Sequence, residues 1–174
     1  MTALAETLAG YGEYHRDHRN VLTHAVGVPM IVLALDVLLA RPVFTMPLLG
    51  VELTPAIIVS ALAAVWYLQL DLKAGLLMTV LLAVFVALGA QIAAISTLAW
   101  LGGGIALFVV GWAFQFIGHH WEGRKPAFVD DLRGLLHGPL FMAYEGLWAL
   151  GLAKGTKREV DALYGSSENR LRSS

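Results

Sequence analysis

Residues 74–121 read AGLLMTVLLAVFVALGAQIAAISTLAWLGGGIALFVVGWAFQFIGHHW and contain no Asp, Glu, Lys or Arg. These 48 residues are long enough to cross a bilayer twice, since one helical crossing needs about 20 apolar residues. The run is interrupted near Ser96 and Thr97 and again at residues 102–104, which are all glycine. It therefore predicts two membrane helices, over residues 74–96 and 98–118.

More apolar sequence precedes this run. Residues 21–40 predict a membrane helix with Asn20 as its N-cap, and residues 54–70 predict another that starts at Thr54–Pro55. Before them, residues 3–16 predict a short amphipathic helix whose apolar face consists of Leu4, Leu8 and Tyr11.

The last apolar segment, residues 134–152, is less suited to crossing a membrane. It contains Pro139 and Glu145, and a carboxylate at the bilayer centre costs about 2.5–3.5 kcal/mol. With four spans, eleven of the twelve Lys and Arg lie on one side and Arg41 alone lies on the other, whereas a fifth span divides them six and six. Because cytoplasmic loops carry an excess of Lys and Arg, four spans with a cytoplasmic N-terminus and C-terminal tail are favoured.

The composition narrows the class of protein. Hydrophobic residues make up 57% of the chain and charged residues only 14%, against about 25% charged in soluble domains. The net charge of −1 does not indicate a nucleic-acid partner, and the absence of cysteine excludes disulfides, zinc–thiolate sites and iron–sulfur clusters. We expect an all-α, polytopic membrane helical bundle of four to five hydrophobic helices plus the amphipathic helix, with one membrane domain (1–153) and a polar tail (154–174).

Five of the six histidines fall in two patches that this topology places on the cytoplasmic face. They are His15, His18 and His24 before and within the first span, and His119 and His120 at the end of the fourth. Neutral imidazole is a common ligand of Fe(II), Zn(II) and Mn(II), and the residues alone do not choose among these metals. The patches predict a metal site at the membrane surface.

The spacing sets conditions on this site. His15 and His24 are nine residues apart, so on one continuous helix they would point in opposite directions and converge only if the chain turns between them. His18 lies in that expected turn and is expected to be a bystander. Adjacent residues of a helix point about 100° apart, so we expect only one of His119 and His120 to face His24 directly.

Polar residues near the second patch have several interpretations. Glu122 is expected to be a hydrogen-bond partner of an imidazole, a direct metal ligand, or an ion-pair partner of Arg124 or Lys125. Arg124 and Lys125 are expected either to bind a lipid headgroup or carboxylate, or only to contribute to the charge bias of the cytoplasmic side.

Two blocks of sequence resemble a known family. Residues 14–29 follow the pattern Y-H-x4-N-x3-H-x2-G-x-P. The second block contains Trp112, QFIGH at residues 115–119, EGRKPA at residues 122–127, Asp131–Leu132 and Gly138–Pro139. In this order, and separated by the 82 mostly hydrophobic residues 30–111, the blocks resemble the 2-hydroxy fatty acid dioxygenase family over roughly residues 10–150.

The resemblance implies a function. Members of the family act in the α-oxidation of 2-hydroxy fatty acids, require Fe(II) and O₂, and release a fatty acid one carbon shorter. Eukaryotic members lie in the endoplasmic reticulum membrane; for this Ala-, Leu- and Gly-rich chain we expect a bacterial inner membrane with the histidine site on the cytoplasmic face.

The resemblance also implies roles for individual residues. His15, His24 and His119 correspond to the metal ligands, and His120 is a candidate fourth ligand. Asn20 and Glu122 correspond to accompanying catalytic positions, Arg124 and Lys125 are expected to bind the substrate carboxylate, and Pro126 and Pro139 correspond to structural prolines. His18 and His137 fall on no motif position.

Two other classes of function remain as alternatives. One is a membrane hydroxylase or desaturase, although the HxxxH and HxxHH boxes typical of their di-metal centres are missing from the sequence. The other is a non-enzymatic lipid-binding or transport protein. Transporters commonly carry internal repeats with polar residues at the midplane, whereas this sequence has no repeat and its polar residues gather at one face.

Overall fold

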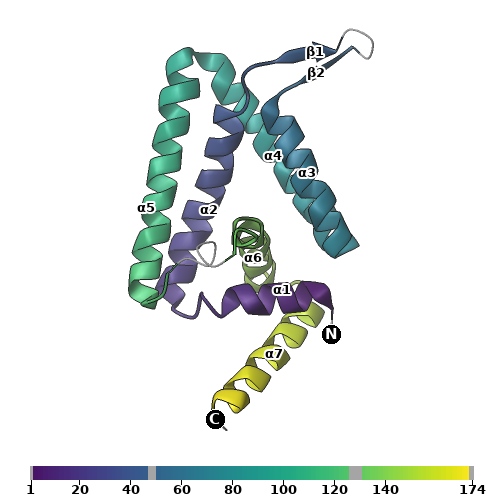
Figure 1. Cartoon of the computed structure of the whole chain (residues 1–174), viewed down its shortest axis with the longest axis vertical. Helices are drawn as coiled ribbons and strands as arrows, with labels where there is room; N and C mark the ends of the chain where they lie inside the picture. Colours follow the sequence, from purple (N-terminus) through teal and green to yellow (C-terminus); the bar gives the residue numbers. More distant parts are fainter. Residues whose placement is uncertain (1, 47–49, 126–130, 173–174) are drawn as a thin grey trace. The chain divides into compact units, whose positions relative to one another are not determined.

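The computed structural model describes residues 2–46, 50–125 and 131–172, with the side chains of all of these except Met46, Val51 and residues 165–172. The elements, in chain order, are α1 (Ala3–Gly12), α2 (His18–Leu38), β1 (Phe44–Met46), β2 (Val51–Leu53), α3 (Pro55–Leu70), α4 (Leu72–Ile95), the π-helical segment η1 (Leu98–Gly103), α5 (Gly104–Glu122), α6 (Gly134–Ala149) and α7 (Lys154–Arg172) (Figure 1). This confirms the all-α helical class. The chain divides into two compact units, residues 26–114 and residues 1–25 with 115–174.

Within the described residues, three helical segments are long and apolar enough to cross a membrane: His18–Leu38, Leu72–Ile95 and Leu98–Glu122. They correspond to three of the four predicted spans. The fourth, α3, is apolar but has 16 residues, or about 24 Å at 1.5 Å per residue, against about 30 Å for the hydrocarbon core. The chain therefore has the helices of a membrane protein.

The unit of residues 26–114 is built around the antiparallel helices α3 and α4, which lie side by side in Figure 1. Thr54 Oγ1 accepts a hydrogen bond from Ile57 N and caps α3, as predicted. Asp71 Oδ1 accepts from Ala74 N at 2.8 Å, so α4 begins at Leu72 rather than at residue 74. A side chain at Gly75 would collide with the backbone of Leu68, so this glycine permits the tight turn between the helices.

The connection between α2 and α3 is more regular than expected. The sequence predicts a loop, whereas β1 and β2 form an antiparallel hairpin in which Phe44 pairs with Leu53.

After α2, Arg41 Nη2 donates a hydrogen bond to Ala93 O at 2.6 Å, and the guanidinium lies 5.0 Å from the centre of the Trp100 ring. The arginine thereby satisfies a free carbonyl near the end of α4.

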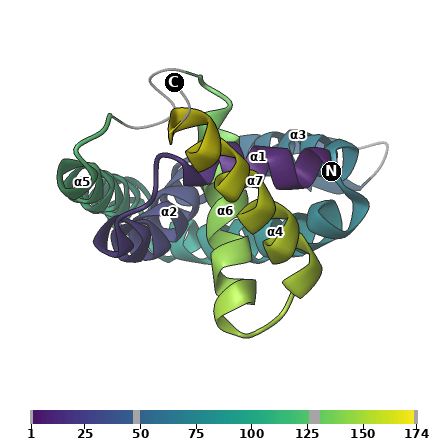
Figure 2. The same ribbon diagram turned by 90° about the horizontal axis from the view of Figure 1, so that it is seen from below.

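The unit of residues 1–25 and 115–174 has α1 packed against α6 and α7. Figure 2 shows α1 crossing these two helices. Leu4, Leu8 and Tyr11 are all buried, which confirms the predicted apolar face. The predicted polar tail contributes α7, whose Val160 is 1% exposed and whose Glu159 accepts a hydrogen bond from Thr2 Oγ1 at 2.9 Å.

Candidate metal centre

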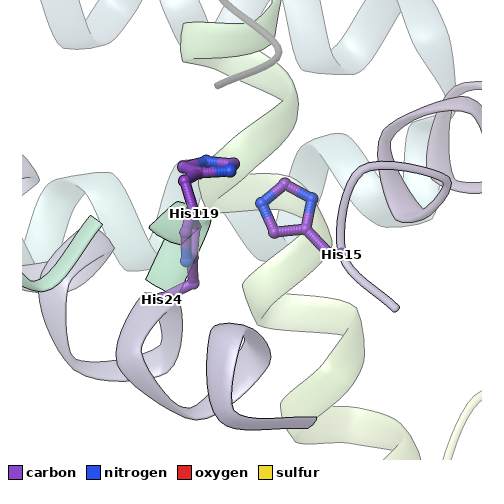
Figure 3. Close-up of side chains that lie close together, drawn as sticks. All are labelled: His15, His24 and His119. Carbon is purple, nitrogen blue, oxygen red and sulfur yellow. The ribbon is translucent and has the colours of Figure 1, made fainter. Parts of the chain in front are cut away.

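Three histidines that are distant in the sequence lie together in the unit formed by residues 1–25 and 115–174. His15 comes from the connection between α1 and α2, His24 from the second turn of α2, and His119 from the last turn of α5. One ring nitrogen of each lies within 4.8 Å of those of the other two, and Figure 3 shows the rings grouped round a common space. The side chains are 5%, 1% and 6% exposed, respectively. We call this set the histidine cluster.

The turn required between His15 and His24 is present. Helix α1 ends at Gly12 rather than at residue 16, and His15 N donates to Gly12 O in the turn that follows. Helix α2 then begins at His18. His15 therefore lies outside both helices, and its ring reaches His24 with the ring centroids 4.4 Å apart.

Asn20 is not the N-cap that the sequence predicts. It lies inside the first turn of α2, because Asp17 precedes the helix and its Oδ1 accepts from Arg19 N at 2.9 Å. The Asn20 side chain is 0% exposed, and its Nδ2 donates to Tyr14 O at 3.2 Å and to Glu122 Oε2 at 3.0 Å. Asn20 thus joins the chain before α2 to the end of α5.

The Glu122 carboxylate binds the backbone of the turn that precedes α2. Its Oε1 accepts from Arg16 N at 3.0 Å, and its Oε2 accepts from Asp17 N at 2.9 Å as well as from Asn20. The cluster of ligand nitrogens does not include this carboxylate. Glu122 therefore holds the backbone that carries His15 against α5, an arrangement that none of the three sequence-based interpretations contained.

Hydrogen bonds define the protonation of two imidazoles. His15 Nδ1 lies 3.0 Å from Tyr11 O, and His24 Nδ1 lies 2.9 Å from Asn20 O. A carbonyl oxygen can only accept, so in both rings Nδ1 carries the proton and Nε2 carries a lone pair. Metal-binding histidines are commonly oriented in this way by a backbone carbonyl.

Two nitrogens of the cluster are buried without a hydrogen-bond partner among the described residues. These are His15 Nε2 and His119 Nδ1.

Burial is the main cause that lowers the pKa of His15 to about 4, with a smaller contribution from His119, while the Tyr11 carbonyl and Glu122 act in the opposite direction. At neutral pH the His15 imidazole is therefore uncharged, which is the form that binds a metal.

Aromatic rings support one side of the cluster. The Tyr11 ring stacks on His15 at 4.3 Å and an interplanar angle of 14°, and Phe141 of α6 lies 5.8 Å from the His15 ring. The sequence predicts Tyr11 only as part of an apolar face and assigns nothing to Phe141. Their involvement depends on how α1 and α6 pack, which local periodicity does not report.

A glycine permits α5 to approach the start of α2. A Cβ on Gly118 would collide with Asn20 Oδ1 and Thr23 Oγ1, and would lie 3.2 Å from His24 Nδ1. Gly118 belongs to the QFIGH motif, which is the signal that singles it out. Gln115 belongs to the same motif and is 5% exposed, one turn before His119.

The remaining predicted residues lie outside the cluster. His120 is exposed, as expected for the neighbour of a histidine that faces inward, and His18 is exposed in the first turn of α2. Arg124 is exposed and its Nη1 donates to Glu13 O at 3.0 Å; Lys125 is also exposed. Pro139 lies inside α6, and Pro126 lies outside the described residues.

Two comparisons with known proteins give the same description. The family model described as 2-hydroxy-palmitic acid dioxygenase Mpo1-like matches residues 1–148. The chain is 34% identical over 161 residues to the 2-hydroxy-palmitic acid dioxygenase MPO1 of Saccharomyces cerevisiae, covering 91% of this chain and 87% of the yeast protein. No solved structure matches it. The chain, with its helices of membrane-spanning length and its buried histidine cluster, belongs to the Mpo1-like family of dioxygenases.

Proposed function

We propose that the protein is a membrane dioxygenase that cleaves 2-hydroxy fatty acids to fatty acids one carbon shorter, with Fe(II) held by His15, His24 and His119. The observation that carries this proposal is the convergence of three buried imidazoles, two of which have a nitrogen with no hydrogen-bond partner among the residues that the structure describes. The name and 34% identity of the yeast relative support the substrate class.

The donor set fits a divalent iron ion. All three ligands are neutral nitrogens, and imidazole binds first-row metals of this kind. Zn(II) has no redox chemistry, whereas a reaction that consumes O₂ needs a metal that exchanges electrons. When bound, Fe(II) would supply the activation of O₂ and a positive charge for an anionic substrate.

The overall reaction needs no further reductant. A 2-hydroxy acid and O₂ yield the shortened acid, carbon dioxide and water, and the two oxidised carbons release as many electrons as the reduction of O₂ consumes. The bond between the carboxyl carbon and the hydroxyl-bearing carbon breaks. The protein therefore has to provide ligands, orientation and a dry site, but no second redox cofactor.

The surrounding residues divide into two groups by what they touch. Asn20, Glu122 and the Tyr11 carbonyl contact the segment or ring of His15 and position it. Arg124 and Lys125 are exposed cations next to the end of α5, and we assign to them the attraction of the substrate carboxylate. His120 is exposed, and we assign it no ligand role.

The apolar helices match a lipid substrate. An acyl chain can partition into the same bilayer as the helices, and each methylene removed from water contributes about 0.8 kcal/mol. We place the histidine cluster at the cytoplasmic face, in a bacterial inner membrane or the endoplasmic reticulum of a eukaryote. The bias of Lys and Arg toward the N-terminus and the segments after α5 supports this orientation.

The test is turnover of 2-hydroxypalmitate by detergent-purified protein, with and without anaerobically added Fe(II). We expect one bound iron per chain and pentadecanoic acid that forms only with iron and O₂. His15→Ala, His24→Ala and His119→Ala should each abolish both, while His120→Ala, a matched change on the next residue of α5, should keep both. Full iron content and activity in folded variants of the three clustered histidines would overturn the assignment.

A further inference from the structure

Gln115 is a buried polar side chain of α5 that the proposed function does not use. It is 5% exposed, and its Nε2 has no hydrogen-bond partner among the described residues. Native structures leave few buried donors unpaired, because each such donor loses its bonds to water without compensation. No group among the described residues accepts from this amide, so the donor is available to an acceptor on a bound molecule.

The position of Gln115 relates this donor to the histidine cluster. Gln115 and His119 are one turn apart on α5, which places their Cβ atoms on the same face at about 5–6 Å. The neighbouring Gly118 packs against Asn20, Thr23 and the His24 ring. The face of α5 that carries Gln115 is therefore the face turned toward the cluster.

The chemistry of the donor limits what it binds. An amide N–H has no lone pair for a metal cation, and the imidazole nitrogens of the cluster cannot accept a hydrogen bond while they hold a metal. Asn20 Oδ1 is a buried acceptor that is also unpaired among the described residues, but no hydrogen bond joins it to Gln115. The remaining acceptor is an oxygen of another molecule. Arg124 and Lys125 offer charge for a carboxylate, whereas a neutral buried donor matches the oxygen of a neutral hydroxyl group.

We propose that Gln115 Nε2 donates a hydrogen bond to the 2-hydroxyl oxygen of the fatty acid and so selects 2-hydroxy acids over unsubstituted ones. This inference rests on the proposed function and assigns its substrate selectivity to a named residue. A site built to pair with a hydroxyl rejects the analogue that lacks it, because the buried donor is then left unpaired.

The test measures binding rather than turnover, with Co(II) in place of iron. Wild-type protein, Gln115→Met and Gln115→Glu are loaded with Co(II) in detergent, and 2-hydroxypalmitate and palmitate are titrated while the visible absorption of Co(II) is followed. Gln115→Met removes the donor at similar volume, and Gln115→Glu replaces it with an acceptor at the same shape. Gln91→Met is the matched control, since Gln91 is exposed on α4.

We expect both Gln115 variants to bind Co(II) at the wild-type stoichiometry and to lose about tenfold in affinity for 2-hydroxypalmitate, the loss of one hydrogen bond. The affinity for palmitate should stay unchanged, and Gln91→Met should behave as wild type. If both variants keep the wild-type ratio of affinities for 2-hydroxypalmitate and palmitate, or if both lose Co(II), the selectivity role is wrong. If the wild-type protein does not bind 2-hydroxypalmitate more tightly than palmitate, the proposed substrate is wrong, and so is the role of Gln115 that rests on it.

Discussion

Asn20 Nδ2 donates a hydrogen bond to Glu122 Oε2 at 3.0 Å, although 102 positions separate the two residues in the sequence. The same carboxylate accepts the backbone N–H groups of Arg16 and Asp17. Together these bonds tie the turn that carries His15 and the start of α2 to the helix that carries His119. These contacts hold the segment that carries His15 beside the end of α5.

Glu122→Ala should weaken metal binding without removing any ligand. The backbone of Arg16 and Asp17 loses its acceptor, so His15 is no longer held beside His119, and loss of such supporting contacts typically costs 10–100-fold in metal affinity. Glu122→Gln keeps one acceptor oxygen and should fall between wild type and Glu122→Ala. Competition of Co(II)-loaded protein with a chromophoric chelator measures the metal affinity. Equal affinity in all three proteins would show that the hydrogen bonds of Glu122 do not support the histidine cluster.

Gly118→Ala should disrupt the site through packing alone. The added methyl group meets Asn20 Oδ1 and Thr23 Oγ1, so α5 must move away from the start of α2, at a cost of about 1–3 kcal/mol for overpacking. We expect a lower melting temperature and a lower iron content. The control is Gly10→Ala in α1, where a Cβ meets nothing within 4 Å and helix propensity predicts a gain of up to about 1 kcal/mol. A Gly118→Ala protein as stable and iron-rich as wild type would contradict this account.

The metal-free protein should lose stability on acidification. The pKa of His15 is about 4 in the folded chain against an ordinary value of 6.5, so between these values the unfolded chain binds a proton that the folded chain does not. The free energy of unfolding therefore falls as the pH drops from about 7 to 4, by up to about 3 kcal/mol from this residue.

Thermal unfolding of metal-free protein at several pH values in that range measures this effect. His15→Gln cannot take up the proton and should show a shallower decline than wild type. Identical pH profiles for the two proteins would mean that protonation of His15 does not contribute.

The orientation in the membrane can be read from engineered thiols, because the chain has no cysteine of its own. His18→Cys places an exposed thiol next to the cluster, and Val43→Cys places one, at a position 51% exposed, after the other end of α2. In sealed right-side-out vesicles, a membrane-impermeant maleimide should label Val43→Cys and leave His18→Cys unlabelled until the membrane is opened. The reverse pattern would place the cluster on the outer face.

Several features follow from the sequence because they depend on local composition. Uncharged runs such as residues 74–121 have to lie in lipid or in a core, and the start of α3 at Thr54–Pro55 is a local capping signal. The approach of the two histidine patches also follows, since the predicted even number of crossings between them returns the chain to the same side. The hairpin of β1 and β2 and the helical character of residues 154–172 do not follow, because short strands and polar helices have weak sequence patterns.

The sequence by itself thus determined the class of the protein and the approach of its two histidine patches, because charge is excluded from lipid and crossings alternate between its two sides. Only the tertiary structure decided that His119 rather than His120 faces inward and that Glu122 binds a turn rather than the cluster. It also decided that Gln115 is buried with a donor that no described residue pairs. These features depend on the rotation of α5 about its axis and on contacts between segments about a hundred residues apart. Side-chain packing between helices sets that rotation, and no local pattern in the sequence encodes it.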